Sequence, residues 1–317
     1  MKKYHYFILI IILSLSVSCD ESFSPVADFR ERNILFSMIN CDTTFQSVIL
    51  SKSYKIEELE EYNDNEGKLI ENADVKIWYR GEVFQFRDTV LSAASNTGLK
   101  YHAYVNKELK PEPDEFLDIE ALLPNGLLLR SSTKTPLNYS FYTTSTDMNV
   151  PSTKHPSYLF FEWEYETNVY YIPKLFVEYY KYSPGKATLL TKELPVDYLS
   201  NGVETSPYFA EPSQRNSISI SMHIVEAGLK ELSAGDPKKD NYRIMEIYFE
   251  LFSMDRNLSA YIAATKNFST DFTVKLDSPD YTNIDGGFGV FGSFSKKSLF
   301  LYYDRDYIES LGYLITY

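Results

Sequence analysis

The chain has 317 residues, 44% of them hydrophobic and 16% aromatic, and carries a formal net charge of −13 at pH 7. Phosphates of nucleic acids and anionic lipid head groups repel so acidic a chain, which argues against nucleic acid binding and against membrane attachment through a basic patch. The length and the apolar content suffice for two domains with buried cores.

Residues 1–18 have the form of a bacterial lipoprotein signal peptide. Lys2 and Lys3 precede an apolar run at 7–13 that is too short to span a bilayer. Residues 15–19 (LSVSC) resemble the relaxed lipobox of Bacteroidota-type bacteria. In a lipobox the cysteine is acylated, with palmitate among the attached fatty acids, and the chain is cut just before the cysteine. We predict lipidation of Cys19, with an ordinary secretory signal as the alternative. Loss of the two lysines with the signal makes the mature chain more acidic, at −15.

Residues 19–27 are expected to form a lipidated tether. The acidic pair Asp20-Glu21 resembles the signal that sends Bacteroidota lipoproteins to the outer cell face, although a solvated tether explains it equally well. The second cysteine, Cys41, has no partner once Cys19 is acylated, and no ligand cluster surrounds it. We therefore expect no internal disulfide and a buried structural thiol at Cys41.

Period-two alternation dominates the first half of the chain and predicts an Ig-like β-sandwich over 28–140. Residues 73–80 alternate, with Ala73, Val75, Ile77 and Tyr79 on one face. The clearest hairpin turns at Asn125-Gly126, where glycine tolerates a positive φ. The sequence at 55–62 is also compatible with a short helix. Further strands are expected near 33–40, 45–52, 83–90, 99–105, 117–123 and 127–129.

Residues 141–157 are rich in Ser, Thr, Asn and Pro and are interpreted as a linker. A β-rich C-terminal domain follows over 158–317, with strands expected around 159–165, 170–181, 218–224 and 245–251. One helix is predicted near 255–267, with Asp255 as its N-cap. The fold class is thus mainly β: two β-sandwich-like domains with one or two short helices.

Residues 287–292 (GFGVFG) spell the dinucleotide fingerprint GxGxxG, but strand-like residues follow where a helix should receive the pyrophosphate. We therefore predict no cofactor and assign the glycines to a bend, with strand, in the C-terminal domain. Residues 281–286 hint at a calcium loop, yet Tyr281 stands at the first ligand position and Gly292 at the twelfth. No dedicated metal site is expected.

Catalytic patterns are missing from the sequence. Three histidines remain in the mature chain (His102, His155 and His223), widely spaced and outside known ligand motifs, and no GxSxG elbow is present. Of each adjacent tyrosine pair, one is expected in the core and one exposed, and the exposed rings could stack on sugars or anchor a protein. Thr43 and Thr89 fall in short patterns that resemble Bacteroidota O-glycosylation acceptors, patterns that also arise by chance.

Three segments resemble a family of Bacteroidota outer-membrane lipoproteins of unknown function: 71–78, then 123–126 followed by 132–136, and 281–292, the most specific of the three. The resemblance implies lipid anchoring in the outer membrane, often beside a TonB-dependent receptor, and carries no site residues. We therefore expect a non-enzymatic lipoprotein that binds a ligand or assists an outer-membrane transporter. The alternatives are a surface structural or adhesive protein and an unrecognised glycan or peptide hydrolase.

Overall fold

The computed structural model confirms a mainly β protein with few short helices. The predicted signal peptide, Cys19, the tether, the helix at 55–62, His155 and most of the 141–157 linker lie outside the residues that the structure describes. Those residues are 31–53, 69–92, 100–142, 158–200, 202, 205–234, 236, 238–269, 281–303 and 305–315.

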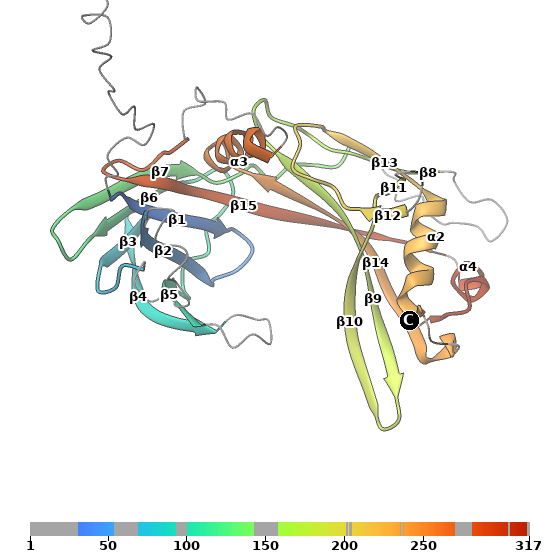
Figure 1. The fold of residues 1–317 in the computed structure, drawn as a ribbon. Coiled ribbons are helices and arrows are strands. Elements are labelled where there is room, and N and C mark those ends of the chain that lie inside the picture. The colour runs from blue at the N-terminus through green and yellow to red at the C-terminus, as the bar shows by residue number, and fades with distance from the viewer. Residues whose placement is uncertain are drawn as a thin grey trace, which may run out of the picture.

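Seven strands of the first half form a sheet that folds over into two layers (Figure 1). The long strand β4 links the layers, because Arg87–Ser92 pair with β5 while Glu82–Phe86 pair with β3. Between the layers lies an apolar core that includes Val75, Ile77 and Ile119. The strands are β1 (Asn33–Asn40), β2 (Gln46–Lys52), β3 (Asp74–Tyr79), β4 (Glu82–Ser92), β5 (Lys100–Asn106), β6 (Phe116–Leu122) and β7 (Leu128–Lys134).

The predicted hairpin between β6 and β7 is confirmed. Gly126 has a φ of +84°, and its amide donates to the carbonyl of Leu123 at 2.9 Å. The amide of Leu127 donates to the Asn125 side chain at 3.0 Å. Positive φ at the glycine and the asparagine side-chain bond are the turn chemistry that the sequence indicated.

The second half continues the same twelve-stranded sheet in the order β10-β9-β14-β15, with β15 beside β1 and β16 beside β14. These strands pack against β8, β13 and α2. Its core is aromatic: the rings of Phe161 and Phe249 stack with centroids 3.9 Å apart. Its elements are β8 (Tyr158–Glu162), β9 (Tyr171–Ser183), β10 (Lys186–Leu194), β11 (Asp197–Ser200), β12 (Thr205–Tyr208), β13 (Ser217–Ser221), α2 (Met222–Lys230), β14 (Tyr242–Met254), α3 (Arg256–Ser269), β15 (Phe288–Leu301), α4 (Arg305–Ser310) and β16 (Leu314–Ile315), with 3₁₀ turns at Glu231–Ser233 and Lys239–Asn241.

Strand β15 belongs to both halves, and Figure 1 shows it running from one into the other. Its first half, Phe288–Phe294, pairs in parallel with β1. Its second half, Phe294–Leu301, pairs antiparallel with β14. The sequence assigned this whole segment, glycines included, to the C-terminal domain, whereas Ile284 and Phe291 pack in the N-terminal core. The N-terminal unit is thus completed by residues far along the chain.

A helix replaces part of one expected strand. The alternation through Ile218, Ile220, Met222 and Ile224 predicted a strand to 224, but β13 ends at Ser221 and α2 begins at Met222. Met222, Val225 and Leu229 are buried, at spacings of three and four that suit one face of a helix. Period two and period 3.6 agree over so short a run, and packing against the second core decides for the helix.

Candidate functional site

Asp255, the predicted N-cap of α3, joins three elements at the boundary between the two units. One carboxylate oxygen accepts the amide of Leu258 at 2.7 Å, which confirms the cap. The other accepts the Thr133 hydroxyl of β7 at 2.6 Å and both the amide and the hydroxyl of Ser293 in β15. Burial raises the pKa of the Asp255 carboxyl above its usual value, although bonds from Thr133, Leu258 and Ser293 oppose the rise.

The glycines of the dinucleotide-like motif serve close packing, as the sequence led us to expect. Gly289 has a φ of +106°, and a Cβ there would lie 2.1 Å from the carbonyl oxygen of Leu35. A Cβ on Gly292 would lie 2.8 Å from the Cβ of Leu258 in α3. The motif therefore lets β1 and α3 approach β15, and no helix follows it to receive a phosphate.

The segment that resembles a calcium-binding loop, residues 281–286, also has a structural role. The Asn283 side chain donates to the carbonyl of Phe291 at 2.7 Å and accepts its amide at 3.0 Å, so it replaces a strand partner. Asp285 exchanges two backbone hydrogen bonds with Arg130 of β7, at 2.7 and 3.0 Å. These contacts close the N-terminal sheet onto the start of β15.

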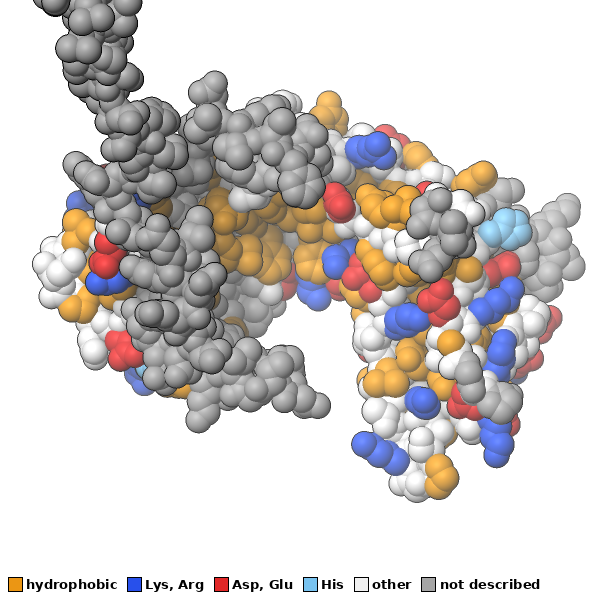
Figure 2. All heavy atoms as spheres, in the orientation of Figure 1, with side chains coloured by type: hydrophobic (Ala, Val, Ile, Leu, Met, Phe, Trp, Pro, Cys, Tyr) orange, Lys and Arg blue, Asp and Glu red, His pale blue; other side chains and the backbone are white. Residues whose placement is uncertain are grey.

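A cavity of about 520 Å³, called here the junction cavity, lies between the two units. Residues 132–137 in and after β7 form one wall, and residues 254–257 at the start of α3 form another. Glu166 and Val169, which precede β9, complete the lining, while Phe116 at its edge is 64% exposed. The space-filling view shows hydrophobic side chains gathered in the hollow between the units (Figure 2).

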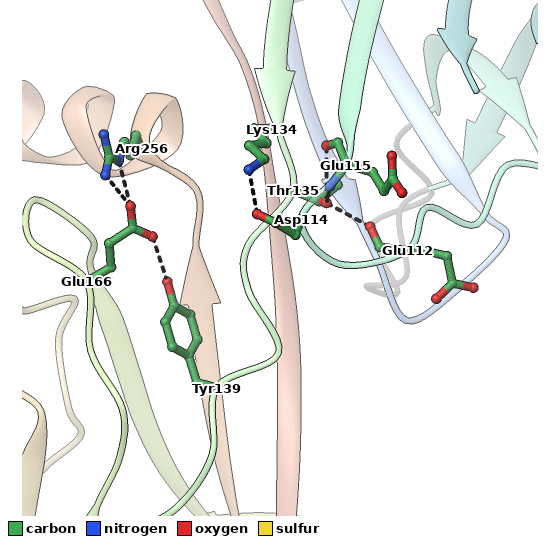
Figure 3. A network of polar contacts seen from close by, with 8 residues as sticks. All are labelled: Glu112, Asp114, Glu115, Lys134, Thr135, Tyr139, Glu166 and Arg256. Carbon is green, nitrogen blue, oxygen red and sulfur yellow. Dashed lines mark hydrogen bonds and ion pairs between the residues drawn. The ribbon is translucent and has the colours of Figure 1, made fainter. Parts of the chain in front are cut away.

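Two ion pairs line the junction cavity, as Figure 3 shows. Lys134 of β7 pairs with Asp114 at 2.5 Å. On the opposite wall, Arg256 of α3 pairs with Glu166, whose second oxygen accepts the hydroxyl of Tyr139 at 3.3 Å. The lining thus offers donors and acceptors in compensated pairs, which suits a polar ligand that forms both kinds of hydrogen bond.

Figure 3 also shows how the loop before β6 is held at the edge of this cavity. The Thr135 hydroxyl donates to the carbonyl of Glu112 at 2.7 Å and accepts the amide of Glu115 at 2.9 Å. Asn257, the second residue of α3, donates to the carbonyl of Ser132 at 2.9 Å. Both walls are therefore fixed by hydrogen bonds to β7 and the residues that follow it.

A smaller cavity of about 250 Å³, called here the lysine cavity, lies on the other side of the segment 137–139. Leu137 and Tyr139 line both cavities. Three lysines line the smaller one: Lys110, Lys296 and Lys297.

A third cavity of about 560 Å³ lies in the C-terminal unit and includes Trp163, Tyr208 and Arg215 in its lining. The indole nitrogen of Trp163 is buried without a hydrogen-bond acceptor among the described residues. Because that nitrogen has almost no accessible surface, it does not offer a ligand contact from within this cavity.

Aromatic rings also form a row on the outer face of the C-terminal sheet. Ring centroids of Phe176 and Tyr248 lie 5.4 Å apart, and those of Tyr248 and Phe300 lie 5.9 Å apart. In two of the tyrosine pairs, Tyr171 and Tyr179 are buried while Tyr170 and Tyr180 are partly exposed, as alternation predicted. In the third pair the prediction fails, because Tyr302 is exposed and Tyr303 is only partly buried.

The other sequence-predicted positions are scattered. Burial raises the pKa of Cys41 to about 12, so the thiol stays protonated, as expected of a structural cysteine. His102 lies between Glu71 and Asp88, 3.3 Å from each, and His223 is exposed on α2.

Neither predicted glycosylation position, Thr43 or Thr89, lines the cavities described above. The hydroxyl of Thr43 accepts the amide of Phe45 at 3.2 Å, and that of Thr89 donates to the carbonyl of Arg87 at 3.0 Å. Both side chains are partly exposed.

Sequence reasoning missed most of the residues that line the junction cavity; Asp255, the predicted N-cap, is one that it named for another reason. Lys134 lies in segment 132–136 of the family resemblance, which carries no site residues. A chain with 44 acidic and 31 basic residues gives no reason to single out Glu166 or Arg256. Within the described part of the chain, no three His, Cys, Asp or Glu side chains gather as a metal site would require. No helix in the described ranges has both the length and the apolarity needed to cross a membrane.

Comparison with known protein families and with curated proteins finds no match to this chain.

Proposed function

We propose that the protein is a non-enzymatic, lipid-anchored lipoprotein of the outer membrane that binds a polar ligand in the junction cavity and assists an outer-membrane transporter. The observation that supports ligand binding is the cavity of about 520 Å³, to which both units contribute lining residues. The lipobox-like sequence before Cys19 and the family resemblance support the anchor and the transporter.

The lining favours a ligand rich in hydroxyl or amide groups, such as a saccharide or a peptide. Lys134 and Arg256 are each paired with a carboxylate, so the wall offers little uncompensated charge to a strongly charged ligand. The exposed ring of Phe116 adds an apolar surface against which a sugar or a side chain can pack.

The anchor is tested by Cys19→Ala. Metabolic labelling with a fatty-acid analogue should tag the wild type and leave the variant unlabelled and released from membranes. The variant should still fold, because the described cores begin after residue 30. Equal labelling of both proteins would refute lipidation at Cys19.

The ligand is tested by calorimetry with saccharide and peptide panels on the full chain purified in detergent. Arg256→Ala removes one side of the cavity lining and should weaken binding about tenfold or more. Arg305→Ala is the matched control, because Arg305 makes an exposed pair with Glu309 on α4, outside the cavity lining. Binding that survives Arg256→Ala unchanged would place the ligand elsewhere.

The transporter is tested by capture of the intact lipoprotein from its own membranes. Reproducible recovery of a TonB-dependent receptor supports the accessory function. Recovery of no transporter together with adhesion to surfaces favours the structural alternative, and turnover of a glycan or peptide favours the hydrolase.

A further inference from the structure

The lysine cavity differs from the junction cavity in how its charges are compensated. Lys296 pairs with Glu250 at 3.1 Å. Lys297 donates only to neutral acceptors, the carbonyl of Tyr139 at 2.8 Å and the side chain of Asn138 at 3.4 Å. Lys110 has no side-chain hydrogen bond or ion pair with any residue in the described ranges, although its charge acts on the Asp42 carboxyl. Among the described residues, Lys110 and Lys297 therefore have no carboxylate in direct ion-pair contact.

Two carboxylates, Asp42 and Glu112, also line the cavity, and neither forms a direct ion pair with Lys110 or Lys297. The Oδ2 atom of Asp42 accepts the backbone amide of Lys296 at 2.8 Å. Burial raises the pKa of Asp42, with Lys296 and Lys110 acting against the rise.

The remaining wall is rigid and offers neutral groups. Pro111 and Pro113 restrict the loop that carries Lys110. The hydroxyl groups of Ser253 and Ser295 are further possible donors to a bound anion. Since the Cys41 thiol stays protonated, it adds no negative charge.

We propose that the lysine cavity binds a small tetrahedral oxyanion, phosphate or sulfate, either free or as the terminal group of a larger molecule, with Lys110 and Lys297 as its principal charge partners. A volume of about 250 Å³ suits such an anion with some of its water. Lysine is a common phosphate ligand because its ammonium is a compact charge with three donors. The proposal does not rest on ligand binding in the junction cavity.

The test is calorimetric titration of the full chain with inorganic phosphate and sulfate, with chloride at equal ionic strength as the reference. Saturable binding is expected, and Lys110→Met should weaken it about tenfold or more. Asp42→Asn should strengthen it, because the amide oxygen can keep the Lys296 bond while the negative charge is lost. Lys186→Met, in the exposed hairpin between β9 and β10, should bind like the wild type.

Melting curves in chloride check that each variant is folded before it is titrated. Titration with glycerol 3-phosphate then separates the two sources: tighter binding of the ester assigns the site to a head group, and tighter binding of inorganic phosphate assigns it to the free ion. Absence of saturable binding below about 10 mM, or an unchanged affinity in Lys110→Met, would overturn the proposal.

Discussion

Asp255 concentrates more structural interactions than any other side chain at the boundary between the units. It is 3% exposed, and its carboxylate accepts four hydrogen bonds from β7, α3 and β15. A buried group with several partners is costly to alter, because each donor left without an acceptor carries its own desolvation penalty. Two predictions follow from this geometry.

Asp255→Asn keeps the size of the side chain and replaces one accepting oxygen with a donor. We expect the free energy of unfolding to fall by about 2–3 kcal/mol, because the amides of Leu258 and Ser293 are fixed donors that cannot turn away. Urea denaturation measures the change. Asp118→Asn, an exposed residue of β6, is the control and should change stability by less than about 0.5 kcal/mol. Equal losses in both variants would contradict the role of Asp255.

The same carboxyl predicts a pH dependence. Its pKa is raised in the folded state above the ordinary 3.8, so the unfolded chain releases this proton first as the pH rises. Stability contributed by Asp255 is therefore full below 3.8 and declines until the pH passes the raised pKa. The stability of the wild type relative to Asp255→Asn should fall over this window and then level off. Denaturation at a series of pH values tests this, and a constant or rising difference would refute it.

Among the elements, β15 shows that a sequence pattern can predict the correct local packing and still be assigned to the wrong domain. The glycines at 287–292 predicted close approach of the backbone, and the structure confirms it at Gly289 and Gly292. The strand that Gly289 approaches, β1, lies some 250 residues earlier in the sequence. Alternation along a strand is local and does not specify which distant strand it pairs with.

Gly289→Ala tests the packing of β15 against β1. The alanine would combine a φ of +106° with a Cβ 2.1 Å from the Leu35 carbonyl oxygen, and we expect a loss of about 3 kcal/mol or more. Gly81→Ala separates the two causes, because Gly81 also has a positive φ, +81°, but nothing lies within 4 Å of the added Cβ. That control should cost about 1 kcal/mol, and chemical denaturation compares the two. Similar losses of stability in the two variants would show that β1 shifts to accommodate the added methyl group.

Other elements show the same limit of local patterns. The strands near 33–40, 73–80 and 117–123 and the capped helix near 255–267 follow from periodicity and capping, and the structure confirms them. The start of α2 and the cavity lining do not follow, because packing between distant segments determines both. Glu166 and Arg256 lie 90 residues apart in sequence and meet only when β9 and α3 are in place.

At the scale of the whole molecule, the shared strand makes the two units depend on each other. The N-terminal core includes Ile284 and Phe291, and β7 exchanges hydrogen bonds with Asp285. A chain ended after the first unit would expose the edge of β1 and part of its apolar core.

We therefore expect a fragment of residues 26–142 to lack a cooperative unfolding transition, while the full chain unfolds in one step. Near-ultraviolet circular dichroism during thermal denaturation distinguishes the two. As a control, the fragment joined through a flexible linker to residues 281–294 should regain a transition, because it recovers the partner of β1. A sharp transition in the bare fragment would show that the first unit is complete without β15.

The pairing of β1 with β15 also constrains the order of folding during synthesis or, under the export proposed above, during passage across a membrane. In either process β1 emerges some 250 residues before its partner β15. The first unit therefore keeps one strand edge open until β15 has emerged. Products of premature termination that lack β15 keep that edge open, and we expect them to be prone to aggregation and proteolysis.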